Sequence, residues 1–282
     1  MALVIRKDRQ FQIIPAHIGL RKYVQYFNIC FPDKDSFTAA YTMMPNACGT
    51  ISLAFDGTRV KAELWGAPLN SYILGAEPNE YKVLVLIKLT HVGLFQLTRH
   101  NQAEFVDKRI SLEEVDPKLY RELTDSFIYS DSVDDMIEIW EKAMYQRMEQ
   151  DAVSGAVLNA ASVIYMNHGL MKVGEVATEI GYCERHLNRL FQSQIGMSTK
   201  QYLGLTRFNY VLKSIQFSSL HLAALSQKAG YFDQAHMDKD FKKICGISPF
   251  EYRSNMSDFY YDGSEKVDMI LYKTKGGFGN EN

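Results

Sequence analysis

The chain has 282 residues, of which 46% are hydrophobic and 23% charged, and its formal net charge is −2. This length allows two domains that each bury a core, and the composition is typical of a globular protein. No run approaches the roughly 20 apolar residues of a membrane span, and the N-terminus lacks the apolar core of an export signal. We therefore exclude a membrane protein and expect a cytoplasmic one.

The first hundred residues are predicted to form mainly strands. Short β-branched or aromatic runs lie at 39–44, 50–55 and 81–89. Asp56 and Gly57 separate the second run from 59–64, which predicts a hairpin turn. The segment 18–27, which follows Pro15, is the exception and is predicted as a short helix.

From about Ser111 the pattern becomes helical. Ser111, with Glu114 three residues later, predicts a capping-box start. The segment 132–148 places apolar residues at spacings of three and four, which predicts a helix with one apolar stripe. This stripe packs either onto its own domain or onto a second copy of the chain. A domain boundary is expected near 150–155.

Helices are predicted after this boundary at 156–167, 172–180, 184–194, 199–216, 220–228 and 233–244, with a short turn at 249–254. Within this region the segment 191–202 returns as 241–252, with Phe, Gly, an apolar residue, Ser and Tyr in the same order. A repeat of this length indicates one supersecondary unit built twice. Each copy has the helix, glycine turn and helix of a helix-turn-helix unit.

Charge is distributed unevenly along the chain. Residues 155–256 hold 11 Lys and Arg against 7 Asp and Glu, whereas residues 1–154 hold 17 against 21 and the last 26 hold 3 against 5. The repeat region is therefore the one basic block, as expected if only this region meets phosphates.

The second helix of each copy has a polar face, which is also typical of an ordinary solvated helix. In the first copy this face carries Arg185, Asn188, Arg189 and Gln192; in the second it carries Gln234, Ala235, Asp238, Lys239 and Lys242. Arg suits guanine and Asn suits adenine in the major groove. Because the face occurs twice with the same turn glycines, we favour DNA contact. The intervening helix of 18 residues spans about 27 Å, close to the roughly 34 Å between successive major grooves.

Residues 155–256 resemble the DNA-binding domain of the AraC/XylS family of bacterial transcription regulators. The motifs that carry the resemblance are 175–181, 187–191, 196–198, 202–203, 207–208, 230–236 and 241–253. Residues 1–150 more loosely resemble the N-terminal domain of one branch of the family, through Pro15, Tyr26, 44–46, Gly75, 93–95 and 105–112.

The resemblance implies that the first recognition helix is the main base reader, with Arg185, Asn188 and Arg189 at base-facing positions. Gln234 and Lys239 are the matching donors in the second. Three residues depart from the family pattern: Cys183 stands where a Ser caps the first helix, Ser226 where Ala is usual, and Asp238 where a neutral residue is common. Because Cys is a poor cap, the first recognition helix is expected to start less firmly. Asp238 repels phosphate but can accept a hydrogen bond from cytosine N4, so the second recognition helix is expected to add less affinity.

Other chemistry finds little support. His236 lies beside the second recognition face. Its side chain is equally compatible with a contact to a DNA phosphate or sugar and with a local hydrogen bond to its own helix. His91 and His100 lack a carboxylate at metal-site spacing, and the scattered cysteines form neither a zinc motif nor a disulfide framework. No catalytic motif is present, so we expect no catalytic residues, metal or cofactor. The residues of an effector site stay unknown.

We therefore predict an α+β protein of two domains that acts as a sequence-specific DNA-binding transcription regulator and not as an enzyme. A β-rich sensing or dimerisation domain with trailing helices spans 1–150. An all-α domain at 155–256 holds two helix-turn-helix units joined by a long helix, and a tail spans 257–282. The expected partners are double-stranded DNA at two adjacent major grooves and no membrane; a small-molecule effector, a homodimer and, for an activator, RNA polymerase are left open. The alternatives are a protein-interaction adaptor that no longer binds DNA and a DNA-tethered enzyme.

Overall fold

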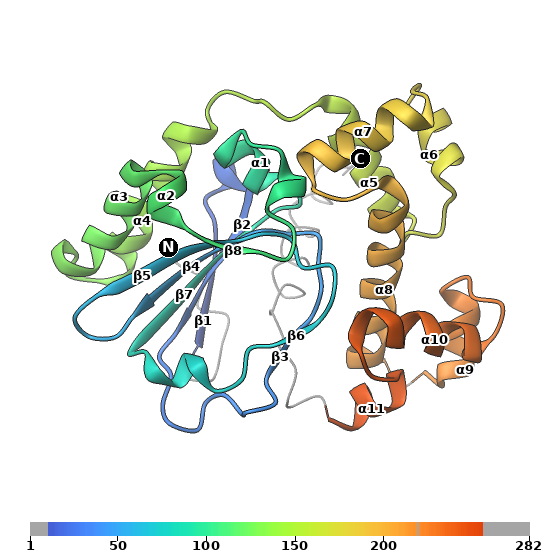
Figure 1. Ribbon diagram of the computed structural model, residues 1–282, viewed down its shortest axis with the longest axis horizontal. Helices are drawn as coiled ribbons and strands as arrows, with labels where there is room; N and C mark the ends of the chain where they lie inside the picture. Colours follow the sequence, from blue (N-terminus) through green and yellow to red (C-terminus); the bar gives the residue numbers. More distant parts are fainter. Residues whose placement is uncertain (1–10, 219, 256–282) are drawn as a thin grey trace, which may run out of the picture.

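The computed structural model describes residues 11–218 and 220–255. An N-terminal β-rich part lies beside an all-helical C-terminal part (Figure 1). The predicted α+β class is therefore confirmed. The predicted tail at 257–282 lies outside the described residues.

A six-stranded antiparallel sheet has the order β1-β2-β7-β4-β5-β8. Its strands are β1 (Phe11–Pro15), β2 (Val24–Cys30), β7 (Val83–Leu89), β4 (Thr50–Phe55), β5 (Val60–Trp65) and β8 (Arg109–Ser111). A separate two-stranded ribbon pairs β3 (Thr42–Met43) with β6 (Tyr72–Ile73). Short 3-10 turns lie at η1 (Ile18–Leu20), η2 (Glu77–Glu80) and η3 (Gln102–Glu104). The predicted hairpin at Asp56 and Gly57 is confirmed as the turn from β4 to β5.

The predicted helix at 18–27 is wrong. The segment forms η1 and then the start of β2, which is paired on both sides, with β1 and β7. Val24, Tyr26 and Phe27 favour a strand because their branched or aromatic side chains pack well on a sheet that is covered on both faces. The predicted strand at 39–44 is shorter than expected and comprises only Thr42–Met43.

The two faces of the large sheet carry different cores. One face packs Phe27, Ile51 and Val85 against α3 (Pro117–Tyr129) and α4 (Val133–Met148). The apolar stripe of α4 is therefore buried on its own domain, with Trp140 fully buried and its Nε1 donating to Ser126 Oγ at 2.8 Å. The opposite face carries a smaller core beneath the β3–β6 ribbon.

Two short helices complete this half: α1 (Gly93–Thr98) and α2 (Leu112–Val115). The predicted capping box of Ser111 is wrong, because its side chain makes no cap hydrogen bond. Ser111 ends strand β8 instead, and Asp116 is the residue that caps the next helix, α3, by accepting from Leu119 N at 2.8 Å.

The C-terminal helices are α5 (Gly155–Met166), α6 (Val173–Glu179), α7 (Glu184–Gln194), α8 (Thr199–Phe217), α9 (Leu222–Lys228), α10 (Gln234–Cys245) and α11 (Pro249–Ser254). Each predicted helix after the boundary is confirmed within a few residues, and the turn at 249–254 is a short helix. Figure 1 shows α8 running between α7 at one end and α10 at the other.

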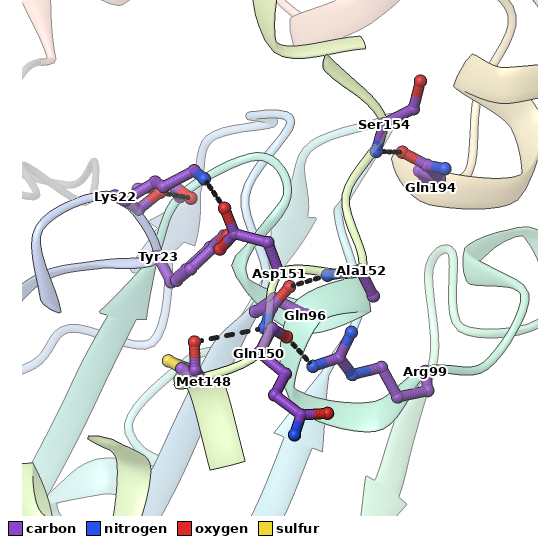
Figure 2. Close-up of polar contacts among 11 residues, drawn as sticks. Lys22, Tyr23, Gln96, Arg99, Met148, Gln150, Asp151, Ala152, Ser154 and Gln194 are labelled. Atoms are coloured by element: carbon purple, nitrogen blue, oxygen red, sulfur yellow. Dashed lines mark hydrogen bonds and ion pairs between the residues drawn. The ribbon is translucent and has the colours of Figure 1, made fainter. Parts of the chain in front are cut away.

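The linker at 149–154 is fixed to both halves (Figure 2). Gln96 donates to the carbonyl of Gln150 at 2.7 Å and accepts from Ala152 N at 3.0 Å. Asp151 accepts from Lys22 and Tyr23, and these hydrogen bonds hold the pKa of the Asp151 carboxyl below its ordinary value. On the other side, the backbone N–H of Ser154 donates to Gln194 of α7 at 2.9 Å. The linker is therefore part of the packed structure.

Candidate nucleic-acid interface

The first helix-turn-helix unit consists of α6, a turn through Gly181 and α7. Gly181 has a φ of 73°, a backbone conformation that glycine adopts without strain. Leu187 and Phe191 are fully buried and Leu190 is half-buried, so the predicted apolar face of α7 is confirmed.

The outward face of α7 carries Arg185, Arg189 and Gln192, all exposed. Their spacings of four and three place them along one side of the helix. Arg189 Nη2 lies 3.2 Å from His186 Nδ1, and the His186 ring stacks on Tyr182 at a centroid distance of 5.3 Å. The Arg189 guanidinium is therefore held on the exposed side of the helix before any partner arrives.

Asn188 has a structural contact as well as its place on the polar face. Its Oδ1 accepts a hydrogen bond from the backbone N–H of Thr199 at 3.1 Å, and the side chain is half-buried. Reading adenine with both amide atoms needs this same oxygen. Asn188 therefore ties α7 to the first turn of α8, and bidentate contact with a base would break that tie.

The two recognition helices begin differently. Cys183 at the start of α7 is exposed and makes no side-chain cap hydrogen bond, as the sequence predicted. At the start of α10, Asp233 Oδ1 accepts from His236 N at 2.8 Å. The one-residue excess of the second copy lies in its turn, where Phe232 is 90% exposed. The second recognition helix thus has the firmer start.

The second unit, α9 and α10, buries Met237 and Phe241 and exposes Lys239, Lys242 and His236. The His236 ring packs edge-on against Tyr231 at 5.3 Å. Gln234 is half-buried, and its Nε2 lies 3.5 Å from Asp238 Oδ2. The freely exposed charges of this face are therefore its lysines, whereas Gln234 faces its own helix neighbour.

Helix α8 contacts the first unit near its start and the second unit from its middle onward. Near its start, Tyr202 packs edge-on against Phe191 of α7 at 5.3 Å. Further along, Arg207 forms an ion pair with Asp240 of α10 at 3.1 Å. Asp240 also accepts from the Tyr231 hydroxyl at 3.1 Å, and burial raises the pKa of Tyr231 to about 12. With 19 residues, α8 is about 29 Å long.

Two loops of the N-terminal half contact the helix-turn-helix units, one loop at the end of α7 and the other at the end of α10. We name them the docking loops, residues 66–71 and 102–108. Gly196, at the end of α7, lies so close to the second loop that a Cβ would stand 2.8 Å from Gln102 O. At the end of α10, Ser71 Oγ donates to Cys245 O at 2.7 Å and Ser71 N donates to Ile244 O at 3.2 Å.

The docking loops are also hydrogen-bonded to each other. Gly66 N donates to Lys108 O at 2.9 Å, and Asp107 Oδ1 accepts from Leu69 N at 2.8 Å. The two helix-turn-helix units therefore rest on one connected support. It contacts the C-terminal ends of α7 and α10, while Arg185, Arg189, Lys239 and Lys242 stay exposed.

The two histidines considered as metal ligands, His91 and His100, each lie beside an aromatic ring. Among residues 11–218 and 220–255, no group of three or more His, Cys, Asp or Glu could hold a metal ion. The His91 ring lies 5.8 Å from that of Tyr202, and His100 lies 6.2 Å from Phe105. In the same described ranges, no helix is long and apolar enough to cross a membrane.

Comparison with known proteins agrees with this geometry. A family model described as a helix-turn-helix domain matches residues 176–255. The transcriptional activator AarP of Providencia stuartii is 30% identical over 105 residues, which cover 37% of this chain and 73% of AarP. The chain belongs to the AraC family of transcription regulators.

Two further proteins are similar to this chain but differ in how much of each chain the similarity covers. The lactose operon transcription activator of Staphylococcus xylosus is 29% identical over 111 residues, which span 39% of this chain but only 40% of that activator. The solved structure of ToxT from Vibrio cholerae is 10% identical, with a TM-score of 0.42, and covers 85% of this chain and 98% of ToxT.

Sequence reasoning missed the contacts that orient the units. The sequence predicts Asn188 only as a base reader, and it points to neither Ser71 nor Asp107. A hydrogen bond between residues 174 positions apart leaves no periodic signal in the sequence. Asp107 has a positive φ of 55°, which is uncommon for a residue other than glycine. The sequence does not reveal this, because aspartate is common in turns of every kind.

Proposed function

We propose that this AraC-family regulator recognises a specific DNA sequence through its two helix-turn-helix units, at residues 155–256, under the influence of its N-terminal domain, residues 1–150. The observation that carries the proposal is the exposed stripe of Arg185, Arg189 and Gln192 on α7, held at a fixed distance from the lysines of α10 by the α8 helix.

The two units have unequal roles in this proposal. Arg185 and Arg189 read base edges, because arginine donates two hydrogen bonds to guanine O6 and N7. Lys239 and Lys242 contact phosphates, which position the protein and add affinity without sequence preference. Gln192 and His236 border these faces and contact the DNA backbone. Gln234 and Asn188 contribute mainly through their contacts within the protein, with Asp238 and Thr199.

Two adjacent major grooves suit this arrangement. The length of α8, about 29 Å, approaches the roughly 34 Å that separates successive major grooves on one side of B-DNA. A single chain then contacts both grooves, so a homodimer would extend the binding site but is not needed to form it.

The N-terminal half influences binding through the docking loops. Because they touch the ends of both recognition helices and each other, a change in either loop alters how α7 and α10 stand relative to one another. We therefore propose that this half senses an effector and transmits its presence by this route. AarP and the lactose operon protein are described as activators, which supports activation and a contact with RNA polymerase.

Selection of DNA from a random pool by the full chain tests the proposal. We expect enrichment of a bipartite site whose two parts lie about one helical turn apart. Mobility shifts on that site should show binding that weakens steeply as salt rises, because phosphate contacts release counterions. Absence of any enriched sequence, together with salt-independent binding, would contradict the proposal and favour the adaptor alternative.

A further inference from the structure

The two helix-turn-helix units contact each other as well as sharing α8. Residues 167–172, the turn that leads from α5 into α6 of the first unit, lie directly on α8, since a Cβ on Gly169 would stand 2.8 Å from Arg207 N. Leu170 then reaches the turn of the second unit, where a Cβ on Gly230 would stand 3.2 Å from Leu170 Cδ2. The turn before α6 therefore touches the turn before α10.

A partly buried charge network joins α8 to the second unit at the same place. Arg207 of α8 forms its ion pair with Asp240 of α10, and its guanidinium lies over the Tyr231 ring, 4.5 Å from the ring centre. The Tyr231 hydroxyl donates at 3.1 Å to Asp240 Oδ2, the same oxygen that pairs with Arg207. The side chains of Arg207 and Asp240 are 28% and 29% exposed. Each member of this network thus has two partners, which restricts its movement.

A third contact holds the α5–α6 turn against α8. The His168 ring stacks on the Tyr210 ring, with the centroids 4.3 Å apart and the planes inclined by 17°. Tyr210 follows Arg207 by three residues, so both side chains lie on one side of α8. We name this set of contacting residues the inter-unit junction, which comprises 168–170, Arg207, Tyr210, 230–231 and Asp240.

The inter-unit junction removes a freedom that α8 alone would leave. A single helix sets the distance between two units along its axis, but each unit can still tilt about its own contacts with that helix. The contact between Leu170 and Gly230 joins the two turns without passing through α8, and the Arg207–Asp240 ion pair holds α10 from the side. Tilting either unit would break or compress these contacts, so α7 and α10 keep one distance and one angle.

The geometry of DNA makes this angle important. One base pair turns the major groove by about 35° and advances it by about 3.4 Å along the axis. When a base pair is added between two binding elements, a pair of flexibly joined units can follow the groove. A pair held at one angle must lose the contacts of one unit or strain the contacts between the units.

We propose that the inter-unit junction fixes the spacing that this protein accepts between the two parts of its DNA site. Leu170, Arg207 and Asp240 are positioning residues, which select DNA by placing α10 relative to α7 and not by touching a base. This inference rests on the proposed function, because spacing matters only if both units bind DNA.

The test measures the affinity of the full chain for its selected site and for versions with one or two base pairs added or removed between the two parts. The wild type should bind the altered sites more weakly by about tenfold or more, because a linked second unit adds affinity only while both units engage. Asp240→Ala should flatten this spacing profile, with a loss of about threefold or less at one added or removed base pair. Its preference for single bases within each part should stay unchanged.

Comparing spacings separates this effect from the change in net charge, which acts on every site alike. Asp116→Ala is the matched control, because Asp116 pairs with Arg147 inside the N-terminal half and its side chain is 30% exposed. Its loss should lower stability and leave the spacing profile steep. Leu170→Ala is the second variant, since Leu170 is 40% exposed and its truncation leaves the core intact. It should flatten the profile as Asp240→Ala does.

Two results would overturn the inference. One is a flat spacing profile in the wild type, because the inter-unit junction would then restrict nothing. The other is a profile that stays as steep in both Asp240→Ala and Leu170→Ala as in the wild type, because these contacts would then serve stability alone. Failure of the wild type to enrich any DNA sequence would instead contradict the proposed function itself, so the two failures are distinguishable.

Discussion

The side-chain hydroxyl of Ser71 donates a hydrogen bond of 2.7 Å to the backbone carbonyl of Cys245, the last residue of α10. The bond joins a loop of the β-rich half to the end of the second recognition helix, away from its exposed lysines. The N-terminal half therefore contacts this helix at its end and leaves the exposed lysines uncovered.

Replacing this hydroxyl should loosen the contact between the halves. Ser71→Ala leaves the Cys245 carbonyl without that donor, and we expect the free energy of unfolding to fall by about 1 kcal/mol. Hydrogen exchange at the amide of Ser71 should speed up as well, because that N–H bonds to Ile244 O. Ser254→Ala is the matched control, since its hydroxyl donates to the Phe250 carbonyl within its own helix. Equal effects of the two substitutions would contradict a special role for Ser71.

Loss of Arg189 should reduce sequence discrimination. Arg189→Ala removes an exposed guanidinium held by His186, and we expect specific binding to weaken by about 1–3 kcal/mol with a relaxed preference at one base pair. Arg59→Ala, an exposed arginine on the β4–β5 hairpin, should leave both quantities unchanged. Mobility shifts on the selected site and its single-base variants measure the effect, and an unaltered preference would remove Arg189 from the readers.

The lysines of α10 should act without regard to sequence. Lys239→Ala and Lys242→Ala should each weaken binding to all DNA sequences by a similar factor. Each should also reduce the slope of log affinity against log salt by about 1, the effect of one lost phosphate contact. Titrations at several salt concentrations, with specific and scrambled DNA, separate this outcome from base reading. A selective loss on the specific site would show that these lysines read bases.

His91 should make the stability of the protein depend on pH. Its Nε2 is buried without a partner among the described residues, and burial lowers its pKa from 6.5 to about 4. Below pH 6.5 the unfolded chain takes up a proton that the folded chain does not, so stability falls as pH drops towards 4. Between pH 7.5 and 5 the loss from His91 should be about 2 kcal/mol.

Denaturant unfolding of the wild type and His91→Phe at these two pH values measures that contribution. The variant should lose less stability on acidification, because phenylalanine does not titrate. His100→Phe serves as the control, since the His100 side chain is exposed. A pH dependence that is the same in His91→Phe and the wild type would contradict the assignment.

The C-terminal helices were predictable from sequence because their signals are local. Turn glycines such as Gly181 and Gly230 adopt the positive φ that helix ends favour, and Phe191 and Phe241 keep their inward positions in both copies. Because the unit is repeated, each of these sequence features occurs twice. The polar faces of α7 and α10 followed from the same periodicity, and the weak start of α7 followed from Cys183.

What the sequence missed depends on contacts between distant residues. The strand at Val24–Cys30 takes its structure from β1 and β7 on either side, and a single segment does not reveal such partners. The second role of Asn188 depends on the backbone of Thr199, eleven residues away.

The central claim, that the two units divide the work of reading and anchoring, is tested most directly by measuring the affinity of the full chain for every single-base variant of its selected site. The account predicts that discrimination is concentrated in the half that α7 contacts and that it flattens there in Arg185→Ala and Arg189→Ala. Discrimination spread equally over both halves, or concentrated where α10 binds, would contradict it.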